Sequence, residues 1–251
     1  MVADDLIPPP EMLHDGSGSI EEFIHGGPGF LYHSLVTRAA LRKEHAVLDI
    51  GSGNGKHARV LADFLTTGRY EGFDIVRETV LWCQEHYARF PNFRFHHADI
   101  YSDWYNKTSP TRASDYLFPF EDSVFDVAFA ASLFTHLMPD ETAQYLRQAW
   151  RVLKPGGRLV MTCYLLNPYN RFTPHKVQGR RFNQVSYQHF ILDPAAPSRG
   201  VAYDEAALRT MVRDAGLLVC EITYGRWANG VDVLDANQDM IVAVKPIDPT
   251  R

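Results

Sequence analysis

The chain has 251 residues, of which 45% are hydrophobic and 22% are charged, and its net charge is −5 at pH 7. This composition is ordinary for a globular protein and excludes a disordered chain, a collagen-like fibre and a coiled-coil rod. The negative charge argues against attraction of nucleic acid over the whole surface, and no apolar run approaches the roughly 18–20 residues that span a bilayer.

The start of the chain and its three cysteines bear on the cellular compartment. Residues 1–5 have neither the basic nor the apolar character of a secretory signal. Cys83, Cys163 and Cys220 are an odd and widely scattered set, which fits neither a disulfide framework nor a zinc ribbon. We therefore expect a cytoplasmic protein that binds no membrane and contains no metal site.

The first 44 residues are predicted to form an arm and a lid helix. Residues 1–29 are rich in proline, glycine and aspartate, which favours an extended segment with one helical turn near residues 20–24. Between Phe30 and Leu41 apolar residues recur at helical spacing, which predicts a helix. Residues 45–251 are expected to form a single domain.

From residue 45 onward, predicted strands and helices alternate, which is typical of βαβ units. We expect an α/β fold with a doubly wound, mostly parallel, seven-stranded sheet and helices on both faces. The last two predicted strands have no helix between them, so the last strand is expected to be reversed. The predicted strands are 46–50, 70–75, 93–97, 124–131, 158–164, 217–224 and 239–245, and the predicted helices are 57–65, 78–89, 140–152 and 204–215.

Two segments are longer than this scaffold needs, at about residues 100–119 and 165–201. The first is rich in aromatic residues where a crossover helix would be expected, and the second is too long for an ordinary connection. Both follow the carboxyl ends of predicted strands, which is the side where open α/β sheets bind ligands. We interpret both segments as functional insertions.

Three glycines, Gly51, Gly53 and Gly55, stand between the first predicted strand and the next helix. Glycine permits positive φ angles and a close approach of the backbone to a ligand. A dinucleotide-binding fingerprint needs a third glycine where Lys56 stands. A P-loop needs one more residue before Gly55 and a hydroxyl in place of His57. The sequence therefore matches neither phosphate-binding pattern.

Acidic residues complete a different pattern around this loop. Asp49 precedes the glycines, Asp74 closes the second predicted strand and Asp99 follows the third. Residues 125–129 then lead into 132–137, and residues 151–160 contain a Lys-Pro-Gly-Gly stretch. In this order the features resemble the class I S-adenosylmethionine-dependent methyltransferases, at motif level over about residues 45–165 and in outline to about residue 245.

The resemblance implies S-adenosylmethionine as the cofactor and S-adenosylhomocysteine as the product. An ionised carboxylate at Asp74 would accept hydrogen bonds from both ribose hydroxyls, and adenine would lie among apolar residues with one polar contact. The cofactor-binding residues that the family pattern implies are Asp49, Gly51, Ser52, Gly53, Asn54, Gly55, Asp74, Ile75, Asp99, Ile100, Ala131 and Ser132.

In methyl transfer the cofactor carries the reactivity, so the protein supplies alignment and, where the acceptor must lose a proton, a general base. His136 follows the fourth predicted strand, near the expected methyl group, and is the first candidate for this base. A histidine there could instead only pack beside the cofactor. His175, Tyr187 and His189, all in the second insertion, are the alternatives.

The acceptor is expected to contact the second insertion and the lid. The second insertion can be a solvated loop or a site for an anionic acceptor, because arginine binds carboxylates and phosphates in a bidentate manner. Its basic residues are Arg171, Lys176, Arg180, Arg181 and Arg199, against the single acid Asp193. The candidate acceptor-binding residues are Tyr164, Arg180, Arg181, Tyr32 and His33.

We therefore expect a methyltransferase that acts on a small molecule, with oxygen as the methylated atom and a carboxylate or sugar derivative as an anionic acceptor. It would work as a monomer or homodimer without nucleic acid. An RNA or protein methyltransferase is the first alternative, although residues 130–133 lack the Asn/Asp-Pro-Pro-Tyr motif that marks methylation of amino groups in similar enzymes. A module that binds the adenosyl ligand without turnover is the second alternative.

Overall fold

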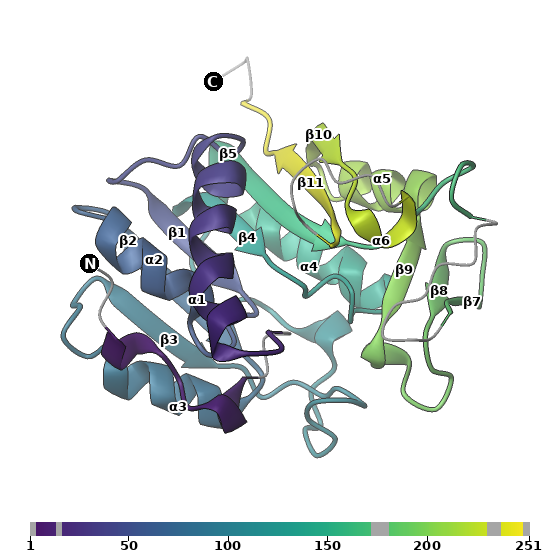
Figure 1. Cartoon of the computed structure of the whole chain (residues 1–251). Helices are drawn as coiled ribbons and strands as arrows, with labels where there is room; N and C mark the ends of the chain where they lie inside the picture. Colours follow the sequence, from purple (N-terminus) through teal and green to yellow (C-terminus); the bar gives the residue numbers. More distant parts are fainter. Residues whose placement is uncertain (1–3, 14–16, 172–180, 230–236, 248–251) are drawn as a thin grey trace.

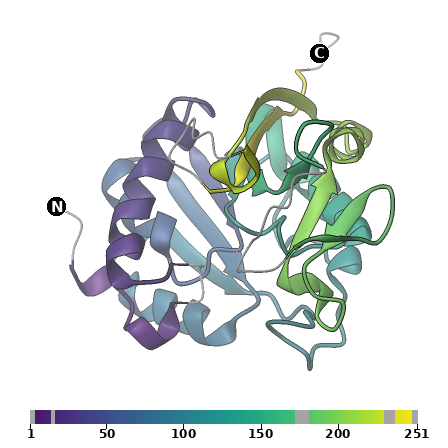
Figure 2. The same ribbon diagram turned by 45° about the vertical axis from the view of Figure 1, so that its right-hand side comes forward.

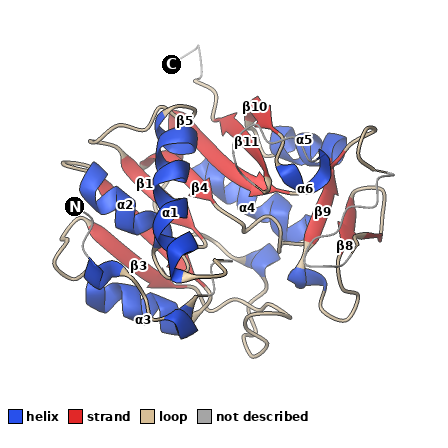
Figure 3. Cartoon of the chain, in the orientation of Figure 1, coloured by secondary structure: helices blue, strands red, loops and turns tan. Residues whose placement is uncertain are grey.

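In the computed structural model, which describes residues 4–13, 17–171, 181–229 and 237–247, a seven-stranded sheet runs through the centre of the chain (Figures 1 and 3). Its strands lie in the order β10-β11-β5-β4-β1-β2-β3. They are β1 (Ala46–Ile50), β2 (Arg69–Asp74), β3 (Phe93–His97), β4 (Phe125–Ala130), β5 (Leu153–Cys163), β10 (Leu218–Thr223) and β11 (Asp239–Val244).

The strand directions confirm the expected doubly wound, mostly parallel arrangement. β1 pairs in parallel with β2 and β4, and β3 and β5 extend the parallel set on either side. β11 is antiparallel to both β5 and β10, so the last strand of the chain is reversed, as expected. It lies between β5 and β10 and not at the edge of the sheet.

Both faces of the sheet are apolar because successive side chains of a strand point to opposite faces. In β1, Leu48 and Ile50 pack into the core beneath α4 (Pro139–Val152) and α5 (Glu205–Asp214), whereas Val47 packs into the core on the other face. That second core includes apolar residues of α2 (Lys56–Phe64) and α3 (Arg77–His86). Burial on both faces explains why β1 and β4 are apolar apart from one aspartate each, Asp49 and Asp126.

The N-terminal segment differs from the prediction, which expected only one helical turn, near residues 20–24, in an otherwise extended arm. Residues Ile20–Gly29 form helix α1, which continues as a π-helical segment over Phe30–Val36. Ser19 begins α1, since its hydroxyl accepts a 3.2 Å hydrogen bond from the backbone N–H of Glu22. A Cβ atom at Gly27 would lie 3.0 Å from the carbonyl oxygen of Lys56, so glycine allows α1 to pack closely on α2.

Pro28 lies inside α1, where a proline removes one hydrogen bond to the carbonyl four residues earlier. That carbonyl belongs to Ile24, and it accepts a 2.8 Å hydrogen bond from the guanidinium group of Arg59 on α2. A buried carbonyl without a partner is costly. The tertiary contact therefore replaces the bond that the helix lacks, which a sequence pattern cannot reveal.

The two insertions have different structures. Residues 100–119, which are described throughout, contain no α-helix but have a 3-10 turn at Ala113–Asp115 and an antiparallel bridge between Ser102 and Asn106. The second insertion contributes to a small sheet with the order β6-β9-β8-β7, which lies on the opposite side of the molecule from α1 (Figures 1 and 2). Its strands are β6 (Leu165–Leu166), β7 (Asn183–Gln184), β8 (His189–Ile191) and β9 (Val201–Asp204).

Three smaller features complete the fold. β5 begins at Leu153, before the predicted start at residue 158, and residues 154–157 form a bulged start of the strand where its register with β4 shifts. A short helix, α6 (Arg226–Asn229), lies between β10 and β11, where no helix was expected. Other 3-10 helices cover Asp4–Leu6, Pro10–Met12 and Pro197–Arg199.

Within the described ranges, no helix is both long and apolar enough to cross a membrane.

Candidate active site

A cavity of about 1000 Å³ opens at the carboxyl ends of β1, β2 and β4, the side expected for ligands. The lining includes residues 51–53 after β1, residues 74–76 at the end of β2 and most of residues 131–138 after β4. The N-terminal helix contributes Phe30, the first insertion contributes Tyr105, and the second contributes Leu192. Both insertions and the N-terminal segment therefore face the same space.

The glycine loop has the positive φ angles that its residues permit. Gly51, Gly53 and Gly55 have φ angles of 84°, 51° and 82°, a region that disfavours other residue types. The N–H groups of Gly51 and Ser52 both donate to the carbonyl oxygen of Phe73, at 2.9 and 3.0 Å. Gly55 forms the N-cap of α2 in a left-handed conformation. The loop thus turns back against β2 and exposes backbone to the cavity.

Asp74 ties this loop to the end of β2. One carboxylate oxygen accepts a 2.8 Å hydrogen bond from the N–H of Gly53, and the other accepts one of 2.8 Å from the N–H of Val76. Burial raises the pKa of Asp74, while these N–H donors act in the opposite direction. Each oxygen retains further acceptor capacity. The carboxylate lines the cavity and can accept hydrogen bonds from a ribose diol.

Asp49 lies beneath the loop and is almost fully buried, with 1% of its surface exposed. Its Oδ2 accepts a 2.8 Å hydrogen bond from Tyr70, but its Oδ1 has no hydrogen-bond partner among the described residues. The hydroxyl of Ser52 on the loop is likewise buried and unpartnered within the described part of the chain. Burial raises the pKa of Asp49 to about 8. Asp49 does not itself line the cavity, so its carboxylate lies behind the glycine loop.

Comparisons with known proteins agree with this geometry. Residues 48–161 match the family described as a methyltransferase domain. The 27-O-demethylrifamycin SV methyltransferase of Amycolatopsis mediterranei (strain S699) is 34% identical over 166 residues, which cover 63% of this chain and 53% of that protein. The chain therefore spans only about half the length of this curated relative.

Solved structures share the fold. A structure of SAM-dependent methyltransferases from Methanosarcina mazei has a TM-score of 0.57 at 21% identity, covering 86% of this chain and 99% of that chain. A protein from Pyrococcus horikoshii OT3 has a TM-score of 0.61 at 17% identity, covering 95% of this chain and 96% of that chain. Residues 48–161 match the methyltransferase domain family, and the chain has the fold of class I S-adenosylmethionine-dependent methyltransferases. Its cofactor is S-adenosylmethionine, as expected.

The cofactor residues that the family pattern implies fall into two groups. Those lining the cavity are Gly51, Ser52, Gly53, Asp74, Ile75, Ile100, Ala131 and Ser132. The others do not line it. Asp49 lies beneath the loop, Gly55 caps α2, and Asn54 is buried and donates to the carbonyl oxygen of Met12 at 2.9 Å. Asp99 is exposed and accepts a 3.0 Å hydrogen bond from Asn106.

Among the candidate bases, His136 is the one that lines the methyltransferase cavity within the described residues. Its Nδ1 lies 2.7 Å from the carbonyl oxygen of Ser198, and burial lowers its pKa. His189 is buried in β8, where its Nδ1 lies 2.9 Å from the hydroxyl of Ser186. Tyr187 is 76% exposed and does not line the cavity. His175 lies outside the described residues.

Only some of the candidate acceptor-binding residues line the cavity. Tyr164 and His33 line the cavity, whereas Tyr32, which is 56% exposed, does not. The ring of Tyr164 packs edge-on against that of Trp227, with centroids 4.9 Å apart. Trp227 also lines the cavity, and its indole N–H donates a 2.6 Å hydrogen bond to the carboxylate of Asp239. Together the two rings form an aromatic wall.

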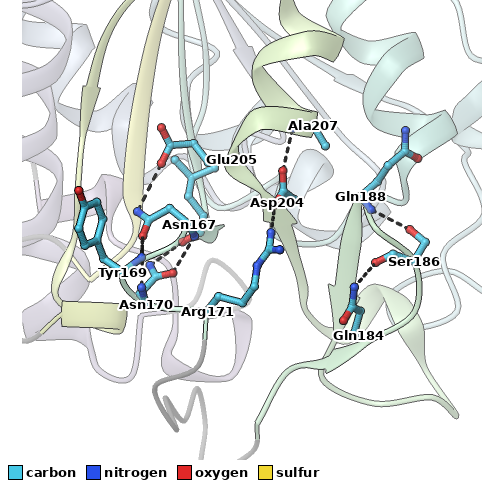
Figure 4. Close-up of polar contacts among 11 residues, drawn as sticks. Asn167, Tyr169, Asn170, Arg171, Gln184, Ser186, Gln188, Asp204, Glu205 and Ala207 are labelled. Atoms are coloured by element: carbon cyan, nitrogen blue, oxygen red, sulfur yellow. Dashed lines mark hydrogen bonds and ion pairs between the residues drawn. The ribbon is translucent and has the colours of Figure 1, made fainter.

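The basic residues of the second insertion do not gather at the cavity. Arg171 forms an ion pair with Asp204, the N-cap of α5 (Figure 4). Arg181 is exposed and does not line the cavity. Arg199 lines the cavity. Its Nη1 lies 3.6 Å from Oδ2 of Asp193, and its Cζ lies 4.8 Å from the ring centroid of Trp104. Lys176 and Arg180 lie outside the described residues.

Several residues that line the cavity were not predicted from the sequence, because they come from distant parts of the chain. Ser132, Thr162 and Gln238 form a closed set of hydrogen bonds. The N–H of Ser132 donates to the hydroxyl of Thr162 at 2.7 Å, and this hydroxyl donates to the side-chain oxygen of Gln238 at 2.6 Å. The side-chain NH₂ group of Gln238 donates to the hydroxyl of Ser132 at 2.9 Å. His57 also lines the cavity, and burial lowers its pKa to about 3. Among the described residues, no three histidine, cysteine or acidic side chains form a metal-binding group.

Proposed function

We propose that this enzyme transfers the methyl group of S-adenosylmethionine to an oxygen atom of a small-molecule acceptor, with His136 as the general base. One observation carries the proposal. His136 lines the cavity with Nδ1 against a backbone carbonyl, which can only accept a hydrogen bond, so Nδ1 carries the proton. Nε2 then has a free lone pair, and the lowered pKa keeps the ring neutral near pH 7.

A base suits an oxygen acceptor because a hydroxyl is a weak nucleophile until its proton is removed. The name of the Amycolatopsis relative indicates that it methylates an oxygen, which supports the same chemistry here. A cavity of about 1000 Å³ is at the upper end of the range for ligand sites, which leaves room for an acceptor beside the cofactor. Tyr164 and Trp227 favour an acceptor with a flat or apolar face.

An anionic acceptor is a narrower form of this proposal. Arg199, and Arg112 from the first insertion, line the cavity and could bind a carboxylate or phosphate. Asp103 and Glu141 line the same cavity, so its lining carries charges of both signs. We therefore place the anionic group, where an acceptor has one, beside these two arginines.

Two measurements test the proposal in sequence. Calorimetric titration with S-adenosylmethionine, S-adenosylhomocysteine and NAD should give binding of the two adenosyl-sulfur ligands and none of NAD. A screen of phenols, hydroxylated macrocycles, sugars and carboxylates would then be followed by S-adenosylhomocysteine release and by the mass of the product. Binding of the cofactor with methylation of RNA or protein, and of no small molecule, would overturn the proposed acceptor class.

A further inference from the structure

Ser198 is the point where both insertions meet the region after β4. It lies in the 3-10 turn Pro197–Arg199 and is 8% exposed. Its carbonyl oxygen is 2.7 Å from Nδ1 of His136. Three residues further along, the N–H of Val201 donates a 2.7 Å hydrogen bond to the carbonyl oxygen of Thr135, next to His136. The second insertion is therefore fixed against the His136 segment at two points.

The other side of Ser198 is held by the first insertion. The backbone N–H of Ser198 donates a 3.2 Å hydrogen bond to Oδ1 of Asp103, and its hydroxyl donates to the same oxygen. The hydroxyl of Ser102 lies 3.1 Å from that of Ser198. Asp103 thus contacts both hydrogen-bond donors of Ser198, while the carbonyl group of Ser198 accepts from His136.

The orientation of an imidazole ring depends on such a partner. Rotation about the last side-chain torsion of histidine is only weakly restricted, and the neutral ring has two tautomers. If the carbonyl of Ser198 moved, the proton could shift to Nε2, and the atom facing the acceptor would become a donor instead of a proton acceptor. The ring of Tyr105 lies edge-on to His136 at 5.5 Å, but a ring edge does not select a tautomer by hydrogen bonding.

We propose that Asp103, acting through Ser198, is a positioning residue that holds His136 in the Nδ1–H tautomer with Nε2 available to the acceptor. This inference rests on the proposed function in taking His136 as the base. It also gives the two insertions a common role, because each supplies one member of the Asp103–Ser198–His136 chain. The other charged residues that line this cavity in the described part of the chain include Arg112, Glu141 and Arg199.

The tautomer can be measured without knowing the acceptor. We would label the histidines with ¹⁵N, record the ring nitrogen resonances of the full chain, and assign His136 by its loss in His136→Gln. The wild-type protein should show a protonated Nδ1, an unprotonated Nε2 and a titration midpoint below the ordinary value of about 6.5. An Nε2–H tautomer in the wild type would overturn the proposal at once.

The variants then test the role of Asp103. Asp103→Ala should give a mixture of tautomers, and Ser198→Ala, which keeps the backbone N–H, should have a smaller effect. Asp103→Asn retains an acceptor oxygen and should remain closest to the wild type. Asp115→Ala changes an exposed aspartate of the same insertion and should leave the His136 resonances unchanged. Unchanged His136 resonances in folded Asp103→Ala and Ser198→Ala would contradict the inference.

Cofactor titration separates this inference from the proposed function. All four variants should bind S-adenosylhomocysteine with wild-type affinity, because none of the changed residues belongs to the glycine loop or Asp74. Once an acceptor is found, Asp103→Ala should lower kcat by about 10- to 100-fold, within the roughly 10²–10⁴-fold that a general base supplies. An intact tautomer without methyl transfer would instead count against the proposed function alone.

Discussion

The hydroxyl of Tyr70 donates a 2.8 Å hydrogen bond to Oδ2 of Asp49, directly beneath the glycine loop. The two carboxylate oxygens therefore have different environments, because Oδ1 is buried without a hydrogen-bond partner among the described residues. Burial is the main cause that raises the pKa of Asp49 to about 8, and the Tyr70 hydrogen bond only partly opposes it. Without a bound cation, the acid is therefore largely protonated at neutral pH.

Asp49→Asn should stabilise the cofactor-free protein at pH 8. The folded-state pKa lies above the ordinary value of 3.8, so the folded protein holds more protons than the unfolded chain between about pH 4 and 8. The stability of the folded protein falls as pH rises through this window, because the buried Asp49 carboxyl must ionise. The asparagine does not ionise, so it should raise the free energy of unfolding by an amount on the order of 1–3 kcal/mol at pH 8. Thermal unfolding at pH 6 and pH 8 measures the effect, with exposed Asp115→Asn as the control.

The same variant should bind S-adenosylmethionine more weakly, because the asparagine lacks the negative charge that an ionised carboxylate behind the loop would provide to a cationic ligand. In the wild type, binding should strengthen from pH 6 to pH 8 and release a proton, which calorimetry in buffers of different ionisation enthalpy detects. Equal affinity at the two pH values, with no proton release, would show that Asp49 stays protonated in the complex.

Asp74→Ala should lower the affinity for S-adenosylhomocysteine by roughly 10- to 100-fold, since hydrogen bonds to a charged group contribute about 1.5–3 kcal/mol. Asp99→Ala tests whether Asp99 binds the cofactor, as the family pattern implies, or lies outside the site, as the geometry indicates. Because Asp99 is exposed and bonded to Asn106, we expect a change of less than about threefold, under 1 kcal/mol. Titration calorimetry measures both, and a large loss with Asp99→Ala would support its predicted role in cofactor binding.

His136→Gln should reduce turnover by about 10²–10⁴-fold while leaving cofactor affinity unchanged. Since burial lowers the pKa of His136, wild-type activity should rise with pH through a midpoint below the ordinary histidine value and be constant near neutral pH. His189→Gln is the matched control, because His189 is buried outside the cavity lining. An equal loss of activity in both variants would indicate a structural effect instead.

Gly27→Ala should destabilise the protein by about 1–3 kcal/mol, as overpacking does. The added Cβ would lie 3.0 Å from the carbonyl oxygen of Lys56 and 3.2 Å from Cγ1 of Val60. Gly29→Ala in the same helix meets nothing within 4 Å and should be neutral or stabilising by about 0.5–1 kcal/mol. Denaturant unfolding of the two variants measures the difference, and similar stabilities would show that α1 does not need a glycine at position 27.

The central sheet and the glycine loop were predictable because their signals are local in the sequence. Val47, Leu48 and Ile50 are apolar because both faces of β1 are buried, and Asp49 is the one polar residue of this strand. Gly51 and Gly55 occupy positive φ angles that few other residues tolerate, so their spacing indicates the loop directly. Such requirements act on neighbouring residues and therefore leave a pattern in the chain.

The N-terminal helix and the surroundings of His136 were decided by contacts between distant residues. A glycine- and proline-rich segment became α1 because Gly27 fits against Lys56 and Arg59 satisfies the carbonyl left free by Pro28. His136 was predictable as a candidate, but its partner Ser198 lies 62 positions away in the sequence. The sequence by itself determined the sheet, the loop and the cofactor, whereas the tertiary structure decided which side chains surround the acceptor, because hydrogen bonds between insertions depend on folded geometry and have no fixed spacing.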